Sequence, residues 1–116
     1  MEKKLIKAIE AMSADERRTV KEKLTSIVDE IDKYRHSYFW NPSSIAVLRR
    51  KNEFEREEIV NIGEYEITFQ SSYRESCQHC YYTKKLCCNG NKTNTTRLNN
   101  IIAKIKELEK VEEEEL

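Results

Sequence analysis

The scarcity of proline and glycine is the strongest constraint that the sequence places on the fold. One Pro and two Gly occur among 116 residues. Because these residue types most often interrupt helices and strands, we expect a few long, continuous elements with short connections. The length suits one domain with a single core, so residues 1–116 should form one domain.

Residues 1–40 have the pattern of two successive helices. Apolar residues recur at helical spacing in a short run and then in a longer one: Leu5, Ile6, Ile9 and Met12, followed by Val20, Leu24, Ile27, Ile31, Tyr34 and Tyr38. Between the runs, Ser13 and Glu16 have the spacing of a capping box, in which the serine oxygen and the glutamate satisfy free amides at a helix start. The second helix should end near Trp40, because the residue before Pro42 resists helical geometry.

Residues 53–90 are expected to form antiparallel strands, preceded by a short helix or connection over residues 41–52. Apolar and polar residues alternate, as in a strand with one buried face, through Tyr65, Glu66, Ile67, Thr68, Phe69 and Gln70. A β-hairpin should turn near Gly63, and a third strand should run through residues 80–88. The polar segment that follows is typical of turns.

Residues 95–115 are expected to form an amphipathic helix capped by Thr95 or Thr96. Its apolar stripe comprises Leu98, Ile101, Ile102, Ile105 and Leu108. Such a stripe more often packs on the sheet of its own domain, and a homodimer through this C-terminal helix is the minority interpretation. The predicted class is therefore α+β, with N-terminal helices, a small two- or three-stranded antiparallel sheet and a C-terminal amphipathic helix.

The cysteines form the main candidate metal site. All four lie in one short segment beside a histidine, so the candidate zinc ligands are Cys77, Cys80, Cys87, Cys88 and His79. A C-x2-C pair suits zinc because its turn brings two thiolates to one side of the ion. Cys87 and Cys88 are adjacent and lack this spacing. All four thiols would therefore share an ion only if Asn89–Gly90 turned the chain.

A hairpin within the cysteine segment is the competing arrangement. Strands over residues 77–82 and 85–90, joined at Thr83–Lys84, would place Cys77, His79 and Cys88 on one face as a three-ligand set. Without any ion, reduced cysteines also pack as small hydrophobic residues. Structural zinc and plain thiols are therefore both compatible with the sequence, whereas disulfides are less so.

No pattern of catalytic residues is present, and we expect a protein that is not an enzyme. His79 adjoins Cys80, so their side chains would diverge on a strand, and there is no P-loop or dinucleotide-binding motif. No apolar run reaches the length that spans a bilayer, so no membrane association is expected. The N-terminal residues lack the features of a signal peptide, which predicts a reducing, cytoplasmic location.

Binding of a macromolecular partner is the function class that the sequence favours. The net charge is zero, and residues 33–97 carry 11 basic and 7 acidic groups, an excess below that of a dedicated nucleic-acid-binding protein. We therefore predict a small intracellular protein that occupies a protein partner's surface, a profile typical of viral or mobile-element inhibitors of host machinery. The alternative is a zinc-containing nucleic-acid-binding regulator, in which cations bind phosphates and aromatic rings stack on bases. Candidate contacts are Arg49, Arg50, Lys51, Tyr81, Tyr82, Lys84 and Lys85, with Trp40 as a protein contact.

Overall fold

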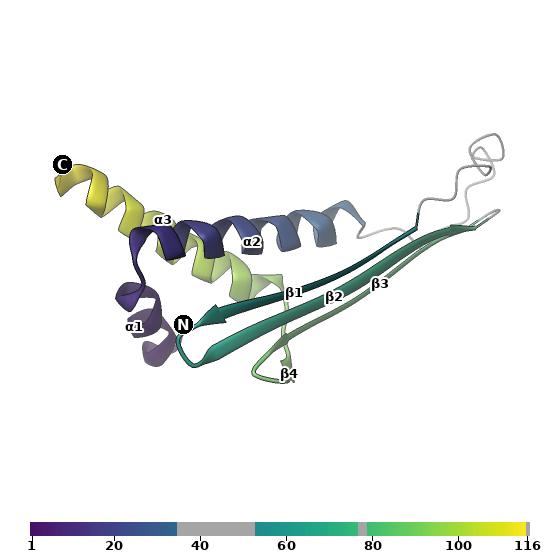
Figure 1. Cartoon of the computed structure of the whole chain (residues 1–116), viewed down its shortest axis with the longest axis horizontal. Coiled ribbons are helices and arrows are strands. Elements are labelled where there is room, and N and C mark those ends of the chain that lie inside the picture. The colour runs from purple at the N-terminus through teal and green to yellow at the C-terminus, as the bar shows by residue number, and fades with distance from the viewer. Residues whose placement is uncertain (35–52, 77–78, 116) are drawn as a thin grey trace.

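The computed structural model describes residues 1–34, 53–76 and 79–115. Within these residues the chain forms three helices and a four-stranded antiparallel sheet with the strand order β1-β2-β3-β4 (Figure 1). The elements are α1 (Lys3–Ala11), α2 (Ala14–Lys33), β1 (Glu53–Ile62), β2 (Tyr65–Ser76), β3 (His79–Cys88), β4 (Asn91–Lys92) and α3 (Thr95–Glu115). The prediction of an α+β fold with helices at both ends is confirmed. The sheet has four strands instead of two or three, because the short β4 pairs with the end of β3.

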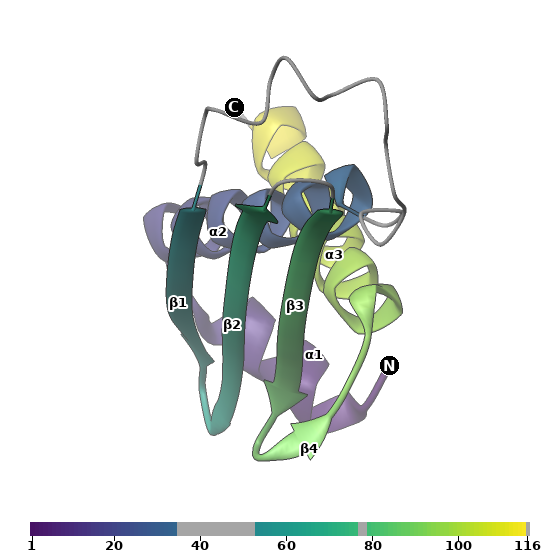
Figure 2. The ribbon, with the colours of Figure 1, turned by 90° about the vertical axis from the view of Figure 1, so that its right-hand side faces the viewer.

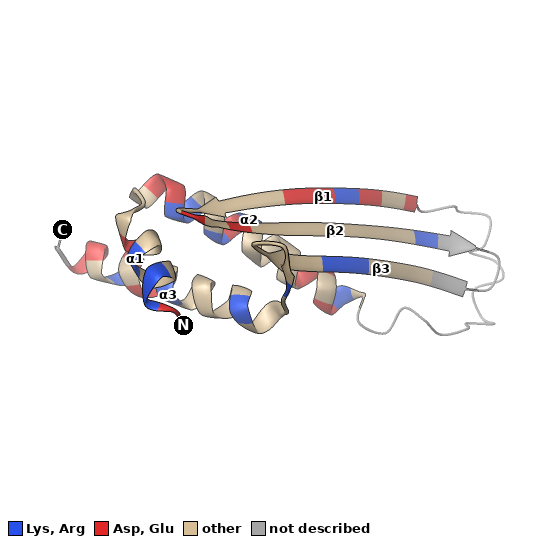
Figure 3. Cartoon of the chain, turned by 90° about the horizontal axis from the view of Figure 1, so that it is seen from below, with Lys and Arg blue, Asp and Glu red and all other residues tan. Residues whose placement is uncertain are grey.

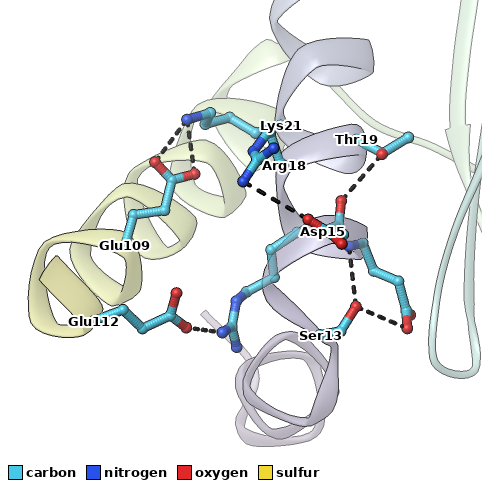
Figure 4. Close-up of polar contacts among 9 residues, drawn as sticks. Ser13, Asp15, Arg18, Thr19, Lys21, Glu109 and Glu112 are labelled. Carbon is cyan, nitrogen blue, oxygen red and sulfur yellow. Dashed lines mark hydrogen bonds and ion pairs between the residues drawn. The ribbon is translucent and has the colours of Figure 1, made fainter. Parts of the chain in front are cut away.

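The start of α2 follows the predicted capping arrangement. The Ser13 hydroxyl accepts a hydrogen bond from the Glu16 amide at 3.2 Å and donates one to the Glu16 carboxylate at 3.1 Å (Figure 4). The helix ends at Lys33 with Tyr34 as its C-cap, which is earlier than the expected end near Trp40. The predicted continuation of α2 and the predicted helix or connection over residues 41–52 lie outside the described residues.

The three long strands pair in two uninterrupted registers. β1 and β2 pair from Glu53↔Arg74 to Ile62↔Tyr65, and β2 and β3 pair from Ile67↔Cys88 to Ser76↔His79. The predicted hairpin turn near Gly63 and the predicted third strand are confirmed. Gly63 has a φ of 58° and is the first residue of a two-residue turn, the position where a type II′ turn favours glycine.

A second tight turn connects β3 to β4. Asn89 has a φ of 51° and Gly90 a φ of 80°, which is the Asn-Gly pattern of a type I′ turn. The Asn89 amide donates to the Glu66 carbonyl at 2.8 Å, and the Asn89 side chain accepts from the Glu66 amide at 2.7 Å. The turn is therefore held to β2 through both backbone groups of one residue, Glu66.

The core lies between the helices and one face of the sheet. Its buried members are Leu5, Ile9, Val20, Leu24, Ile27, Val28, Ile31, Val60, Ile62, Ile67, Phe69, Leu86, Cys88, Leu98, Ile101, Ile102 and Ile105. The α3 stripe is thus buried within its own chain, as the sequence predicts, and the structure gives no support to a homodimer through that stripe. The Asn94 side chain accepts a hydrogen bond from the Thr96 amide at 3.0 Å. The residue that caps α3 is therefore Asn94, and the prediction of Thr95 or Thr96 is wrong by one or two positions.

Ion pairs fasten α2 to α3. Arg17 is 7% exposed, and its guanidinium pairs with Glu112 of α3 and donates to the carbonyl oxygens of Ile9 and Glu10 near the end of α1. One turn further along α2, Lys21 pairs with Glu109 at 2.7 Å (Figure 4). Carbonyls in the last turn of a helix lack partners from a following turn, and Arg17 donates to two such carbonyls of α1. Together with its pairing to Glu112, this connects all three helices.

No helix among the described residues is both long and apolar enough to cross a membrane.

Gly63→Ala should destabilise the fold more than Gly90→Ala. Both replacements put a Cβ at positive φ, which costs about 1–2 kcal/mol. A Cβ at residue 63 would also lie 2.8 Å from the Cβ of Ala8, whereas one at residue 90 meets no atom within 4 Å. The overpacking at residue 63 should add about 1–3 kcal/mol, measured by guanidinium unfolding followed by circular dichroism. Equal losses in the two variants would show that the α1 contact has no energetic effect.

Arg17→Met should lower the free energy of unfolding by about 2 kcal/mol, because hydrogen bonds from a buried charged donor are lost. Arg18→Met is the matched control, since the Arg18 side chain is 65% exposed and makes an exposed pair with Asp15. The control should change stability by no more than about 0.5 kcal/mol. Urea denaturation of both variants measures the difference, and similar losses would rule out a special role for Arg17.

Candidate functional site

One face of the sheet is left uncovered by the described chain. Figures 1 and 2 show α2 and α3 on one side of the sheet and α1 at the end where the β1–β2 turn lies, with no described helix on the other side. Successive side chains of a strand point to opposite faces. The register then assigns to this open face Glu53, Glu55, Glu57, Ile59 and Asn61 of β1, Glu66, Thr68, Gln70, Ser72 and Arg74 of β2, and Tyr81, Thr83, Lys85 and Cys87 of β3.

The charge on the open face is unevenly distributed. In the ribbon of Figure 3, β1 carries acidic residues interrupted by a basic one, and β3 carries basic residues. Of the open-face residues, four are glutamates and two are cations, Arg74 and Lys85. Glu53 and Arg74 form an exposed ion pair at 3.7 Å, an arrangement that contributes little to stability. Glu55, Glu57 and Glu66 have no ion-pair partner among the described residues, so their carboxylates are available to a ligand.

A shallow hollow lies on the open face, at the end of the strands opposite the Gly63 turn. It has a volume of ≈ 780 Å³ and is lined by Glu53, Phe54, Glu55, Ser72, Tyr73, Arg74, Tyr81 and Thr83. The Tyr81 side chain at the hollow is 47% exposed, and Ile59 on the same face is 48% exposed. The hollow is open to solvent and broad, so it suits contact with a large partner better than enclosure of a small molecule.

Aromatic rings support this part of the sheet from the opposite face. The Tyr34 ring at the end of α2 lies 5.8 Å from Phe54, 4.7 Å from Tyr73 and 5.0 Å from Tyr82, measured between centroids. Phe54 and Tyr73 stack on each other at 5.6 Å. All three strands are thereby held to α2 beneath the hollow, and aromatic pairs of this kind contribute about 0.5–1.5 kcal/mol beyond their buried area.

A polar network lies next to the aromatic rings. Glu30 of α2 accepts a hydrogen bond from the Tyr82 hydroxyl at 2.6 Å and pairs with Arg56 at 3.2 Å. Arg56 also donates to Ser26 at 3.1 Å and pairs with Glu58 at 3.3 Å. Burial, together with the hydrogen bond to the negatively charged Glu30, raises the pKa of Tyr82 far above its ordinary value. Tyr82 is thus a neutral structural hydrogen-bond donor.

The structure separates the residues that the sequence indicated as partner contacts. Tyr81 and Lys85 lie on the open face, whereas Tyr82 and Lys84 lie on the face that carries the helices. Tyr82 is 3% exposed, so its ring belongs to the interior and does not offer a stacking surface. The other four residues named in the sequence analysis as contacts, Trp40, Arg49, Arg50 and Lys51, lie outside the described residues.

The hairpin within the cysteine segment, one of the two arrangements that the sequence left open, is wrong. β3 runs without interruption from His79 to Cys88, so Thr83–Lys84 is not a turn. Positions 80 and 87 are seven residues apart on this strand, or about 23 Å at 3.3 Å per residue. Although the chain does turn at Asn89–Gly90, the backbone at Cys80 lies too far away for all four thiols to share one ion.

Cys87 and Cys88 are free, buried thiols on opposite faces of β3. Cys77 lies outside the described residues, and nothing is described of the side chains of His79 and Cys80. Over the described part of the chain, no group of three or more His, Cys, Asp or Glu residues is arranged to hold a metal ion. Zinc binding by residues of the cysteine segment stays a prediction.

Comparisons of the chain with protein-family models, with curated proteins and with solved structures find no match. A function therefore has to be inferred from the chain's own residues and geometry. The open face stands out because it is a broad surface that the described helices leave uncovered, with a hollow and three carboxylates that have no ion-pair partner within the described chain.

Most residues of the open face were not singled out from the sequence. Glu55, Glu57, Gln70, Ser72 and Thr83 are ordinary polar residues that resemble any solvated strand surface. The alternation of polar and apolar residues along all three strands is the signal that would have found them. The register of the sheet places these polar residues side by side on one face. That register is fixed by the turn at Gly63 and by the pairing of β2 with β3.

Tyr82→Phe should reduce the loss of stability at high pH. The pKa of Tyr82 is raised in the folded chain, so above about pH 10 the unfolded chain loses its phenolic proton while the folded chain keeps it. The free energy of unfolding therefore falls as pH rises above this point. The variant should be about 1–2 kcal/mol less stable at pH 7 and should show a smaller decline between pH 9 and 11 in urea titrations. An unchanged decline would contradict the assignment.

Proposed function

We propose that this chain is a non-catalytic module that binds a protein partner through the open face of its sheet. The observation that carries the proposal is a sheet face that the described helices leave uncovered and that aromatic rings support from the other side, with an exposed tyrosine at its hollow. Tyrosine is enriched among the residues that dominate binding energies at protein interfaces. A solvated sheet face is common by itself, so the hollow, Tyr81 and the carboxylates are what favour recognition.

The charge of the open face favours a protein over a nucleic acid. Four glutamates against Arg74 and Lys85 would repel the phosphate backbone, which supplies most of the non-specific affinity of nucleic-acid-binding proteins. A protein with a basic surface would gain from the same carboxylates. A nucleic-acid-binding regulator would therefore have to use another part of the chain, such as Arg49–Lys51.

The mode of action that follows is occupation of a surface. A module that supplies contacts without a catalytic constellation changes its partner's activity by covering a site or by holding the partner in place. An inhibitor of host machinery encoded by a virus or mobile element acts in this way, and this is the finer form of the proposal. It rests on the absence of catalytic motifs in the sequence and on the uncovered face, and it requires a partner with a basic patch.

Photo-crosslinking tests the proposal in cells that express the chain. A photoreactive amino acid is placed at Gln70 or Thr83 on the open face and, as a control, at Lys23, an exposed residue of α2. We expect one and the same protein to be captured from both open-face positions and not from position 23. Capture from position 23 alone, or capture of nucleic acid from the open face, would contradict the proposal.

A purified partner allows the second part of the test. Tyr81→Ser should weaken binding at least about tenfold, because truncation of an interface tyrosine costs more than about 1.4 kcal/mol. Lys23→Ser is the matched control and should leave affinity unchanged. Isothermal titration calorimetry measures both, and thermal unfolding checks that each variant is folded. Equal affinities for the two variants would remove the open face from the interface.

A further inference from the structure

β1 forms a free edge of the sheet. In the order β1-β2-β3-β4 it has a neighbour on one side only, and no other strand of the described chain pairs with it. β1 contains 10 residues, has no proline, and pairs with β2 without a bulge. Long, regular edges of this kind readily accept another strand, and natural proteins usually shorten, bulge or charge them to prevent it.

The hydrogen-bonding direction of β1 follows from the rest of the sheet. Glu66 of β2 bonds to Asn89 at the end of β3, so the even-numbered residues of β2 direct their amides and carbonyls toward β3. The odd-numbered residues, from Tyr65 onward, therefore bond to the even-numbered residues of β1. The backbone groups that point out of the sheet belong to the odd-numbered residues Glu53, Glu55, Glu57, Ile59 and Asn61.

The residues with outward backbone groups are the same residues that carry the acidic side chains of the open face. Glu53, Glu55 and Glu57 recur at every second position, so a strand laid along β1 would place each of its alternate side chains beside a carboxylate. Two copies of β1 facing each other would oppose like charges, which disfavours pairing between identical edges. A strand with cations at alternate positions would instead pair its charges with these glutamates.

We propose that the partner of this chain supplies an extended segment with Lys or Arg at alternate positions, and that this segment adds to the sheet as a new strand beside β1. This inference rests on the proposed function and names the part of the partner that is recognised. The backbone groups of Glu55, Glu57 and Ile59 hold the segment, and the carboxylates select its charge. Addition of a strand to a sheet edge is an established way of recognising peptides, with the backbone supplying affinity and alternate side chains specificity.

The open face alone is smaller than one side of a standard protein interface. Strands of 10 residues span about 33 Å, and three strands about 14 Å, which makes a planar footprint of roughly 460 Å². A stable interface removes about 800 Å² of accessible surface from each partner. A partner that also occupies the neighbouring edge extends the contact by one more strand, and the face and the edge share the same glutamates.

The opposite edge of the sheet is the principal competitor for β1. The residues of β3 before Leu86 carry Lys84 and Lys85, and the Leu86 carbonyl is already bonded to the Thr93 amide at 2.9 Å. Pairing of β1 in one copy with this part of β3 in the next would be complementary in charge, but it would not close. Such an association adds copies without limit and grows with protein concentration, which distinguishes it from binding of a partner's segment.

Hydrogen exchange measured by NMR on the full chain tests the proposal with a defined probe. The probe is a nine-residue peptide with blocked ends, in which Lys alternates with Thr and Val. We expect saturating peptide to slow exchange of the Glu55, Glu57 and Ile59 amides at least about tenfold, with little change at the even-numbered residues, which are already bonded to β2. A peptide with Glu in place of Lys, and a Lys peptide N-methylated at alternate amides, are the matched controls and should have no such effect. Protection by the N-methylated peptide, or none by the Lys peptide, would overturn the inference.

Two variants at one position separate backbone pairing from charge. Glu57→Pro removes an amide that points out of the sheet, a position where proline is tolerated in edge strands, and it should abolish peptide-induced protection. Glu57→Gln keeps the amide and should reduce affinity for the Lys peptide severalfold without abolishing protection. If the proline variant unfolds, the N-methylated peptide still tests backbone pairing in the unaltered chain. A sedimentation coefficient that increases with protein concentration in the absence of peptide would show that a second copy, and not a partner's segment, occupies the edge. That result would overturn the inference.

Failure of this inference can be told from failure of the proposed function. If Tyr81→Ser weakens binding of the captured partner while Glu57→Pro has no effect, the open face binds and the edge does not. If neither variant affects the partner, both proposals are wrong. Loss of binding in both, with protection of the outward amides of β1 by the partner, is the result expected here.

Discussion

The uninterrupted pairing of β1, β2 and β3 is the constraint on which the rest of the structure depends. Since side chains alternate along a strand, a slip of one residue would exchange the buried and solvated sets completely. With the observed register, Ile67 and Phe69 meet the helices, while Glu55 and Glu57 face away from them. The same register decides which backbone groups of β1 remain unpaired within the described chain. The core, the open face and the free edge are therefore consequences of one alignment.

Contacts between the helices hold them together on one side of the sheet. Arg17 reaches from α2 to the last carbonyls of α1 and to Glu112 of α3, and Lys21 pairs with Glu109 one turn away. Three helices joined in this way form a single layer with one apolar surface, which the sheet covers. At the far end Glu30, Arg56 and the aromatic rings continue the contact between layers. The result is a two-layer fold in which the described helices cover one face of the sheet.

Local patterns in the sequence predicted the elements well, but not all of their ends. Hydrophobic periodicity identified α1, α2, the β1–β2 hairpin, β3 and α3, because each element buries one continuous stripe. The hairpin proposed at Thr83–Lys84 failed because neither residue favours positive φ, whereas the turns at Gly63 and Asn89–Gly90 adopt it. The cap of α3 was displaced because Asn94 and the threonines after it all have suitable side chains. The candidate site was largely missed because polar residues acquire meaning only when neighbouring strands bring them together.

Because the two sheet faces have separate contacts, residues on one face can be substituted independently of residues on the other. Ile67 and Thr68 are neighbours in sequence, yet one packs in the core and the other contacts solvent on the open face. Substitutions at sites without shared contacts have nearly additive effects. Residues of the open face can thus be exchanged in many combinations without loss of folding. A scaffold of this kind can follow a target whose surface is itself mutating, and it offers directed evolution a set of positions to randomise while the core is left intact.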